Sequence, residues 1–157
     1  AMEASAHIES SRRPDAVTRR LVVVRLDREY ALPAEHVLEV VRMVAVTPLP
    51  EAPPWLAGVI NLRGRVVPLI DLRIRLGLPP VEHGLTTAIL ILQAGGTIVG
   101  LIADVVTEML EVGTDAIEPP GELAGLNSPV SELARAGDRL ILILDAARLC
   151  DAAAVFA

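Results

Sequence analysis

The segment Pro53–Leu76, PPWLAGVINLRGRVVPLIDLRIRL, decides the fold. Within it, two apolar runs, VINL and RVVPLIDL, are separated only by the dipeptide Arg63-Gly64. Apolar runs joined by so short a glycine-containing corner are typical of a β-hairpin. Gly64 suits the corner because glycine adopts positive φ angles without a steric penalty. The pattern therefore predicts a hairpin with Arg63 at its exposed tip, where chemistry alone favours a solvated turn residue over a binding residue.

The composition predicts one domain with an aliphatic core. Of the 157 residues, 52% are hydrophobic but only 2% are aromatic, so Val, Ile, Leu and Ala must fill the core. The net charge of -6 and the shortage of aromatic side chains weigh against nucleic acids and anionic membrane surfaces as partners. A single cysteine, no signal-peptide pattern and no apolar run of membrane length predict a cytoplasmic location without direct membrane insertion.

Short runs of β-branched and aliphatic residues between turn residues predict a mostly β chain. The strands expected outside the central hairpin are Leu21–Leu26, Glu29–Pro33, Val44–Thr47, Thr87–Leu92, Thr97–Ala103 and Arg139–Leu144. Residues Asp104–Val112 fit a bulged strand about as well as a helix. Helical turns are expected at Ala34–Val41 and Trp55–Ala57. Asp71 and Asp145 are each expected to cap a short helix that follows.

Residues that commonly perform chemistry are scattered along the sequence. His7, His36 and His83 lie far apart and lack Cys or carboxylate neighbours at ligand spacing. The glycines form neither a phosphate loop nor a dinucleotide fingerprint, and there is no nucleophile elbow. Cys150 has no basic neighbour in sequence and is expected to pack as a small apolar side chain. The sequence therefore predicts no catalytic residue, no metal site and no cofactor.

Three motifs around the central hairpin resemble those of a known family. They are Pro-Glu-Ala-Pro at Pro50–Pro53, Gly-Val-Ile-Asn-Leu-Arg-Gly at Gly58–Gly64, and Val-Pro-Leu-Ile-Asp-Leu at Val67–Leu72. At this spacing the run resembles the signature of CheW-like domains, the coupling scaffolds of bacterial chemotaxis. The resemblance covers about Arg20 to Leu149, which is nearly everything outside the two ends.

The resemblance implies an all-β fold. CheW-like domains consist of two small five-stranded SH3-like barrels that share a core, here with short helices and a C-terminal helix. The family pattern also makes Asp104–Val112 a strand. We expect a flexible N-terminal tail over residues 1–18, one CheW-like domain with two barrel subdomains over 19–150, and a C-terminal tail over 151–157.

The resemblance implies a function as well. CheW-like proteins are non-catalytic adaptors that couple chemoreceptors to a CheA-type histidine kinase in two-component signalling. The expected partners are the regulatory domain of that kinase, against one barrel, and the tip of a methyl-accepting chemoreceptor, in a groove between the barrels. A CheW-like module of another signalling system, or a small barrel with a different ligand, is the alternative.

Several residues match family positions that are tied to receptor or kinase binding. They are Arg63, Glu39, Val37, Gly58, Asn61, Leu62 and Gly64. The resemblance implies that Glu39 pairs with Arg63 and orients it beside an apolar groove lined by Val37. Exposed ion pairs contribute only about 0–1 kcal/mol to stability, so this pair would serve to position the Arg63 side chain rather than to stabilise the fold. The alternative is that the pair merely keeps two strands in register.

One segment departs from the family pattern. The family usually has Gly-Xaa-Gly before its last strand, whereas Glu132 and Ala134 stand at the expected glycine positions. A positive φ angle would be costly for either residue. We therefore expect a remodelled backbone over Asn127–Ala136, such as a helical turn. Whether this surface binds the usual partner stays open, and a chemosensory system other than flagellar chemotaxis is an alternative.

Overall fold

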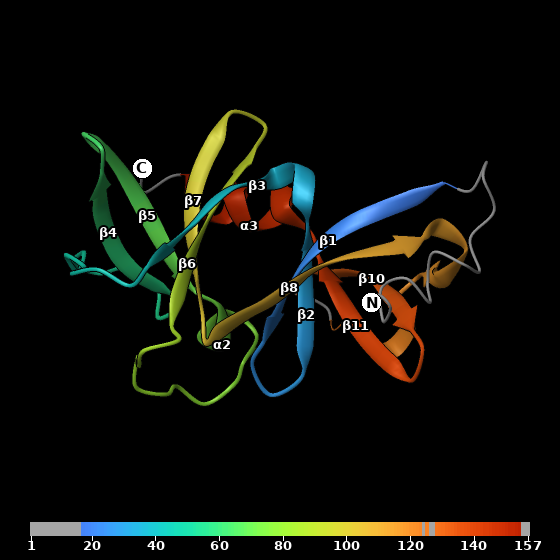
Figure 1. Cartoon of the computed structure of the whole chain (residues 1–157). Helices are drawn as coiled ribbons and strands as arrows, with labels where there is room; N and C mark the ends of the chain where they lie inside the picture. The colour runs from blue at the N-terminus through green and yellow to red at the C-terminus, as the bar shows by residue number, and fades with distance from the viewer. Residues whose placement is uncertain (1–16, 124, 126–127, 155–157) are drawn as a thin grey trace.

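The described residues form two β-sheets and a few short helices (Figure 1). The computed structural model describes residues 17–123, 125 and 128–154. One sheet contains, in spatial order, β8 (Val105–Gly113), β1 (Thr18–Arg25), β2 (Glu29–Pro33), β11 (Arg139–Leu144), β10 (Val130–Ala136) and β9 (Ile117–Glu118). The other contains β3 (Val37–Arg42), β6 (Ala88–Ala94), β7 (Thr97–Ala103), β5 (Arg65–Asp71) and β4 (Leu56–Leu62). The helices are α2 (Leu72–Arg75) and α3 (Ala146–Ala153), with 3₁₀ turns at Ala34–His36, Thr114–Ala116 and Gly121–Leu123.

In each sheet, one segment of the chain bends so that its two parts pair with strands at opposite ends of the strand order, which closes the sheet into a barrel. In the first sheet β8 pairs with β1, and after one 3₁₀ turn β9 pairs with β10. In the second sheet β3 pairs with β6, and further along Thr47 exchanges two 2.9 Å backbone hydrogen bonds with Val59 of β4. The sheet of six strands is thus a five-stranded barrel whose closing strand is bent into β8 and β9. The predicted all-β fold of two small barrels is confirmed.

The two barrels repeat one strand order. We call the sheet from β3 to β7 the central barrel, and the sheet built from both ends of the chain the terminal barrel. In each, a parallel pair joins two antiparallel hairpins: β5 with β7 in the central barrel and β11 with β2 in the terminal barrel. In each barrel a short helix follows one of these hairpins: α2 follows β5, and α3 follows β11. An aspartate caps each helix, since Asp71 accepts a hydrogen bond from the Ile74 amide and Asp145 accepts one from the Arg148 amide. The terminal barrel is thus a circular permutation of the central one.

Strand alternation builds a core shared by both barrels. In β1, Leu21 and Val23 point into the terminal barrel, whereas Val22 and Val24 join the shared cluster. Central strands such as β6 and β7 contribute to the same shared cluster, and so does α3 through the fully buried Leu149. Figure 1 shows α3 between the two barrels. This explains the continuous apolar runs, because strands covered on both faces have no polar side.

Of the two predicted helical turns, the one at Ala34–Val41 holds only for its first three residues, and the one at Trp55–Ala57 is wrong. Only Ala34–His36 forms a 3₁₀ turn, and the remainder of the predicted helical segment belongs to strand β3. β3 carries apolar residues on both faces, because Val37 and Val41 are half-buried on one face while Leu38 and Val40 are exposed on the other, so its sequence does not alternate between apolar and polar residues. Trp55 lies in a turn in which the Leu56 amide donates to the Pro53 carbonyl at 3.0 Å, and β4 begins directly afterwards. The strand predicted at Val44–Thr47 is reduced to the single bridge of Thr47.

The segment that lacks the expected glycines is a strand, not a helical turn. β10 pairs with β11 along its length, with one shift of strand register between Val130 and Glu132. Glu132 and Ala134 keep ordinary backbone angles, so no glycine is needed. Glu132 also pairs with Arg19 at 2.9 Å, which ties β10 to β1. Asn127 and the residue before it lie outside the described residues, as do residues 1–16 and 155–157 of the two predicted tails. α3 continues into the predicted C-terminal tail as far as Ala153.

Candidate partner-binding groove

The tip of the central hairpin presents Arg63 on a tight two-residue turn. Leu62 pairs with Arg65, and the two loop residues, Arg63 and Gly64, have φ angles of 52° and 84°. Two successive positive φ angles define the type I′ turn, which matches the twist of the flanking strands. The Gly64 amide donates to Asn61 Oδ1 at 2.8 Å and closes the turn. Holding an arginine in this conformation costs about 1–2 kcal/mol, a cost that asparagine or glycine would largely avoid.

Glu39 holds the Arg63 side chain against strand β3. Nη1 of Arg63 donates to Oε2 of Glu39 at 2.5 Å, and Nη2 donates to Oε1 at 2.7 Å. These hydrogen bonds hold the pKa of the Glu39 carboxyl below its usual range and raise the pKa of the Arg63 guanidinium. The Arg63 side chain remains 68% exposed, so its other N–H groups face solvent. The ion pair that the sequence suggested is therefore present in the structure.

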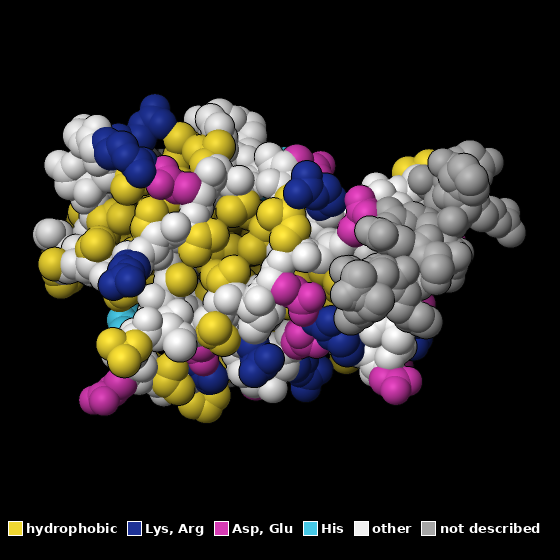
Figure 2. All heavy atoms as spheres, viewed as in Figure 1, with side chains coloured by type: hydrophobic (Ala, Val, Ile, Leu, Met, Phe, Trp, Pro, Cys, Tyr) yellow, Lys and Arg dark blue, Asp and Glu magenta, His cyan; other side chains and the backbone are white. Residues whose placement is uncertain are grey.

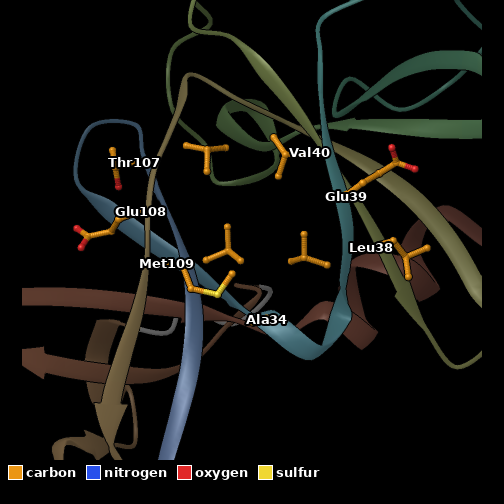
Figure 3. Close-up of a pocket in the computed structure, with 10 residues that line it drawn as sticks. Ala34, Leu38, Glu39, Val40, Thr107, Glu108 and Met109 are labelled. Atoms are coloured by element: carbon orange, nitrogen blue, oxygen red, sulfur yellow. The ribbon is translucent and has the colours of Figure 1, made fainter. Parts of the chain in front are cut away.

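An apolar groove runs between β3 of the central barrel and β8 of the terminal barrel. It has a volume of about 420 Å³, and its lining residues are Val22, Ala34, Val37, Leu38, Glu39, Val40, Val106, Thr107, Glu108 and Met109. Figure 3 shows Val40 and Met109 pointing into the space between the strands, while the carboxylates of Glu39 and Glu108 point outward on opposite sides. Three lining side chains are more than two-fifths exposed: Leu38, Val40 and Met109.

Exposed apolar side chains gathered in one groove are typical of a protein-binding surface. Figure 2 shows the corresponding hydrophobic patch in the middle of this face, with charged side chains on either side of it. An apolar centre with a polar rim is the usual anatomy of a protein interface. The groove therefore offers a docking surface between the two barrels.

A cluster of three charged residues forms the rim on the β8 side. Nε and Nη2 of Arg139 donate to the two oxygens of Glu29 at 3.0 and 2.7 Å. Nη2 also donates to Oε2 of Glu108 at 2.6 Å. Neither Glu108 nor Arg139 is among the site residues that the sequence predicts. The three residues come from β2, β8 and β11, and no local motif connects them.

The Glu29–Arg139 pair predicts a specific dependence of stability on pH. Hydrogen bonding from Arg139 lowers the pKa of the Glu29 carboxyl. The ionised carboxylate therefore stabilises the fold above its unfolded-state pKa, and this contribution is lost as the pH falls through the lower folded-state pKa. We expect Glu29→Gln to reduce the free energy of unfolding at pH 7 by about 1 kcal/mol or less.

Urea denaturation between pH 3 and pH 7 measures this effect. The difference between Glu29→Gln and the wild-type protein should shrink toward the acid end. The matched control is Glu82→Gln, in the exposed loop before β6. Stability curves that stay parallel over the whole range would show that the pair does not stabilise the fold.

The predicted site residues separate into two groups. Val37 and Glu39 line the groove, and Arg63 lies at its β3 rim through its pair with Glu39. The other four residues shape the hairpin and do not line the groove. Gly58 is a point of close backbone approach to Thr47, Asn61 and Gly64 close the turn, and Leu62 packs against the core of the central barrel.

The described residues offer little for catalysis. They contain no group of three or more His, Cys, Asp or Glu side chains placed to hold a metal ion. The Cys150 side chain is fully buried in the shared core, and burial raises the pKa of its thiol to about 11. A buried protonated thiol is a poor nucleophile. No helix in the part of the chain that the structure describes combines the length and apolarity needed to cross a bilayer.

A family profile described as the CheW-like domain matches residues 20–154. The chain belongs to the CheW-like family. It is 36% identical over 119 residues to the chemotaxis protein CheW of Helicobacter pylori, covering 75% of this chain and 72% of that protein. It is 35% identical over 133 residues to a probable chemotaxis protein CheW of Rhizobium etli, covering 84% and 82% of the two chains.

Solved structures support the same assignment. The scaffolding protein TtCheW of Thermoanaerobacter tengcongensis superposes with a TM-score of 0.77 at 34% sequence identity. The match covers 82% of this chain and 89% of the TtCheW chain. The CheW-like fold therefore extends over both barrels, and the groove described above is formed entirely within it.

Proposed function

We propose that this chain is a non-catalytic adaptor that couples chemoreceptors to a CheA-type histidine kinase in bacterial chemosensory signalling. Its relatives are named as chemotaxis and scaffolding proteins, which supports a coupling role. The observation that carries the proposal is the apolar groove between the barrels, with Arg63 held at its rim by Glu39. A scaffold needs such docking surfaces and no reacting group.

The receptor partner is proposed from the shape and chemistry of the groove. Val40 and Met109 offer apolar contacts from opposite walls, and both rims carry charged groups. An amphipathic helical segment satisfies such a groove, because its apolar face covers the centre and its polar flanks meet the rims. The tip of a methyl-accepting chemoreceptor, a helical hairpin, has this character. The regulatory domain of the kinase would then bind one of the barrel surfaces outside the groove.

Replacing Arg63 tests the receptor proposal without disturbing the fold. Arg63→Asn removes the charge but supplies a residue that tolerates the positive φ of the turn. We expect the affinity for a chemoreceptor cytoplasmic fragment to fall about fivefold, and thermal stability to stay equal or rise slightly. Isothermal titration calorimetry and thermal denaturation measure the two quantities.

The matched control is Arg135→Asn. Arg135 forms a comparable two-hydrogen-bond pair with Glu118 and is 62% exposed, but it does not line the groove. Unchanged receptor affinity for a folded Arg63→Asn protein would remove Arg63 from the site. Co-purification with a CheA-type kinase tests the second partner, and its failure with an otherwise folded protein would favour the alternative of another signalling system.

A further inference from the structure

The charged rims of the groove occupy equivalent places in the two barrels. β8 is the counterpart of β3, and the β10–β11 hairpin is the counterpart of β4–β5. In the central barrel, Arg63 in the hairpin loop reaches Glu39 on β3. In the terminal barrel, Arg139 directly after the hairpin loop reaches Glu108 on β8. Each barrel thus places a hairpin arginine on a glutamate of its groove-lining strand.

The two rims differ in what they leave available to a ligand. Both oxygens of Glu39 accept from Arg63, whose remaining N–H donors face solvent. On the opposite rim, Arg139 is held by Glu29 through two hydrogen bonds and reaches only Oε2 of Glu108. Within the described residues, Oε1 of Glu108 has no hydrogen-bond partner. One rim therefore offers donors and the other offers an acceptor.

We infer that this charge polarity fixes the direction in which a helical ligand lies in the groove, with Glu108 as a specificity-determining residue. The inference rests on the proposed function and names the chemistry of the same partner. A matching ligand carries an apolar strip between two flanks, with an acidic side chain facing Arg63 and a basic side chain facing Glu108. Complementary charges at an interface fix register and exclude wrong orientations more than they add affinity.

The cluster around Glu108 is built to keep that carboxylate in place. Glu29 fixes Arg139 from β2, and Arg139 in turn orients Glu108 from β11. Arg25 lies opposite Glu29 in the β1–β2 register and offsets part of its negative charge. Of the two glutamates in this cluster, Glu108 lines the groove and keeps one carboxylate oxygen available to accept a hydrogen bond from a ligand. A fixed acceptor loses less conformational entropy on binding than a mobile surface glutamate does.

Charge substitution at Glu108 tests the inference. The probe is the cytoplasmic fragment of a methyl-accepting chemoreceptor from the source organism, titrated by calorimetry into the full chain. We expect Glu108→Gln to weaken binding about threefold and Glu108→Lys about tenfold or more. Replacing a basic residue beside the apolar tip of the fragment by Glu should restore binding to Glu108→Lys and should weaken binding to the wild-type protein.

The matched control is Glu118→Lys, which alters a paired glutamate of the terminal barrel that does not line the groove. Thermal denaturation checks folding, and Glu108→Gln preserves the shape of the side chain should Glu108→Lys fail to fold. If the wild-type protein does not bind the fragment, the proposed function and this inference fail together. If the wild-type protein binds and Arg63→Asn weakens it, while folded Glu108 variants bind like the wild type, only the inference is wrong.

Discussion

Gly58→Ala is expected to lower the free energy of unfolding by about 3–5 kcal/mol, the largest stability loss among the substitutions considered. A Cβ atom at this position would lie 2.2 Å from the Thr47 carbonyl oxygen and 2.8 Å from the Thr47 carbonyl carbon. Those atoms belong to backbone and cannot swing away as a side-chain end would. The φ angle of 146° adds strain for any residue with a Cβ.

The structural consequence of this substitution is local opening of the central barrel. Thr47 and Val59 close that barrel through their two backbone hydrogen bonds, and Gly58 is adjacent to Val59. For a chain of this size, the loss corresponds to a fall of about 10 °C in the thermal midpoint. Circular dichroism melting measures the midpoint, and hydrogen exchange at the Thr47 and Val59 amides reports the opening directly.

Alanine substitutions at two other glycines separate backbone strain from crowding as causes of the stability loss expected for Gly58→Ala. Gly64→Ala introduces a Cβ at a φ angle of 84° but into open space, so it measures backbone strain alone. Gly100→Ala brings a Cβ 2.3 Å from Leu69 Cδ2 and 2.9 Å from Ile89 Cγ2 at an ordinary φ angle, so it measures crowding against buried side chains rather than against backbone. Each should cost less than Gly58→Ala. A Gly58→Ala protein as stable as Gly64→Ala would show that the Thr47 backbone yields without penalty.

Val40→Asp is expected to cause the largest loss of receptor binding, about 30-fold or more in Kd. Val40 points into the groove from β3 and is 45% exposed, so the unbound protein can hydrate an aspartate there. A bound helical segment would bury that carboxylate against apolar side chains without a partner, which is costly. The same titration with the chemoreceptor fragment measures the effect.

The matched control for this substitution is Leu140→Asp. Leu140 is 39% exposed on β11 and does not line the groove, so the change introduces a similar charge on a similar surface. Receptor affinity should stay within about twofold of the wild-type value, since surface substitutions outside the interface have small effects. Equal losses for both variants would mean that the groove is not the docking surface.

The central hairpin could be predicted because its determinants are local. The Arg63-Gly64 corner specifies a two-residue turn, and Asp71 specifies the helix that follows, within one short stretch of chain. The Glu39–Arg63 pair needed the family resemblance, because residues 24 positions apart share no local signal. With that resemblance, the groove beside Val37 could be anticipated as well.

Other features depend on contacts that the sequence does not encode locally. The Arg139–Glu29 pair joins residues 110 positions apart, and no spacing rule connects them. The sequence of β3 resembles a helical segment because this edge strand carries apolar residues on its half-buried face and also on its exposed face, so apolar and polar residues do not alternate. At β10, Glu132 and Ala134 belong to a strand and have ordinary backbone angles, so the remodelling expected from the missing glycines does not occur.

The circular permutation of the terminal barrel has a consequence for synthesis on the ribosome. All strands of the central barrel lie within one continuous stretch, Val37–Ala103, so this barrel can close while later residues are still being added. The hairpin β1–β2 precedes the central barrel in the chain, whereas its partners β8 and β11 follow the central barrel. The face of β1 that carries Leu21 and Val23 therefore stays uncovered until β8 and β11 have been made, and this nascent hairpin is exposed to aggregation for longer than the strand pairs of the central barrel.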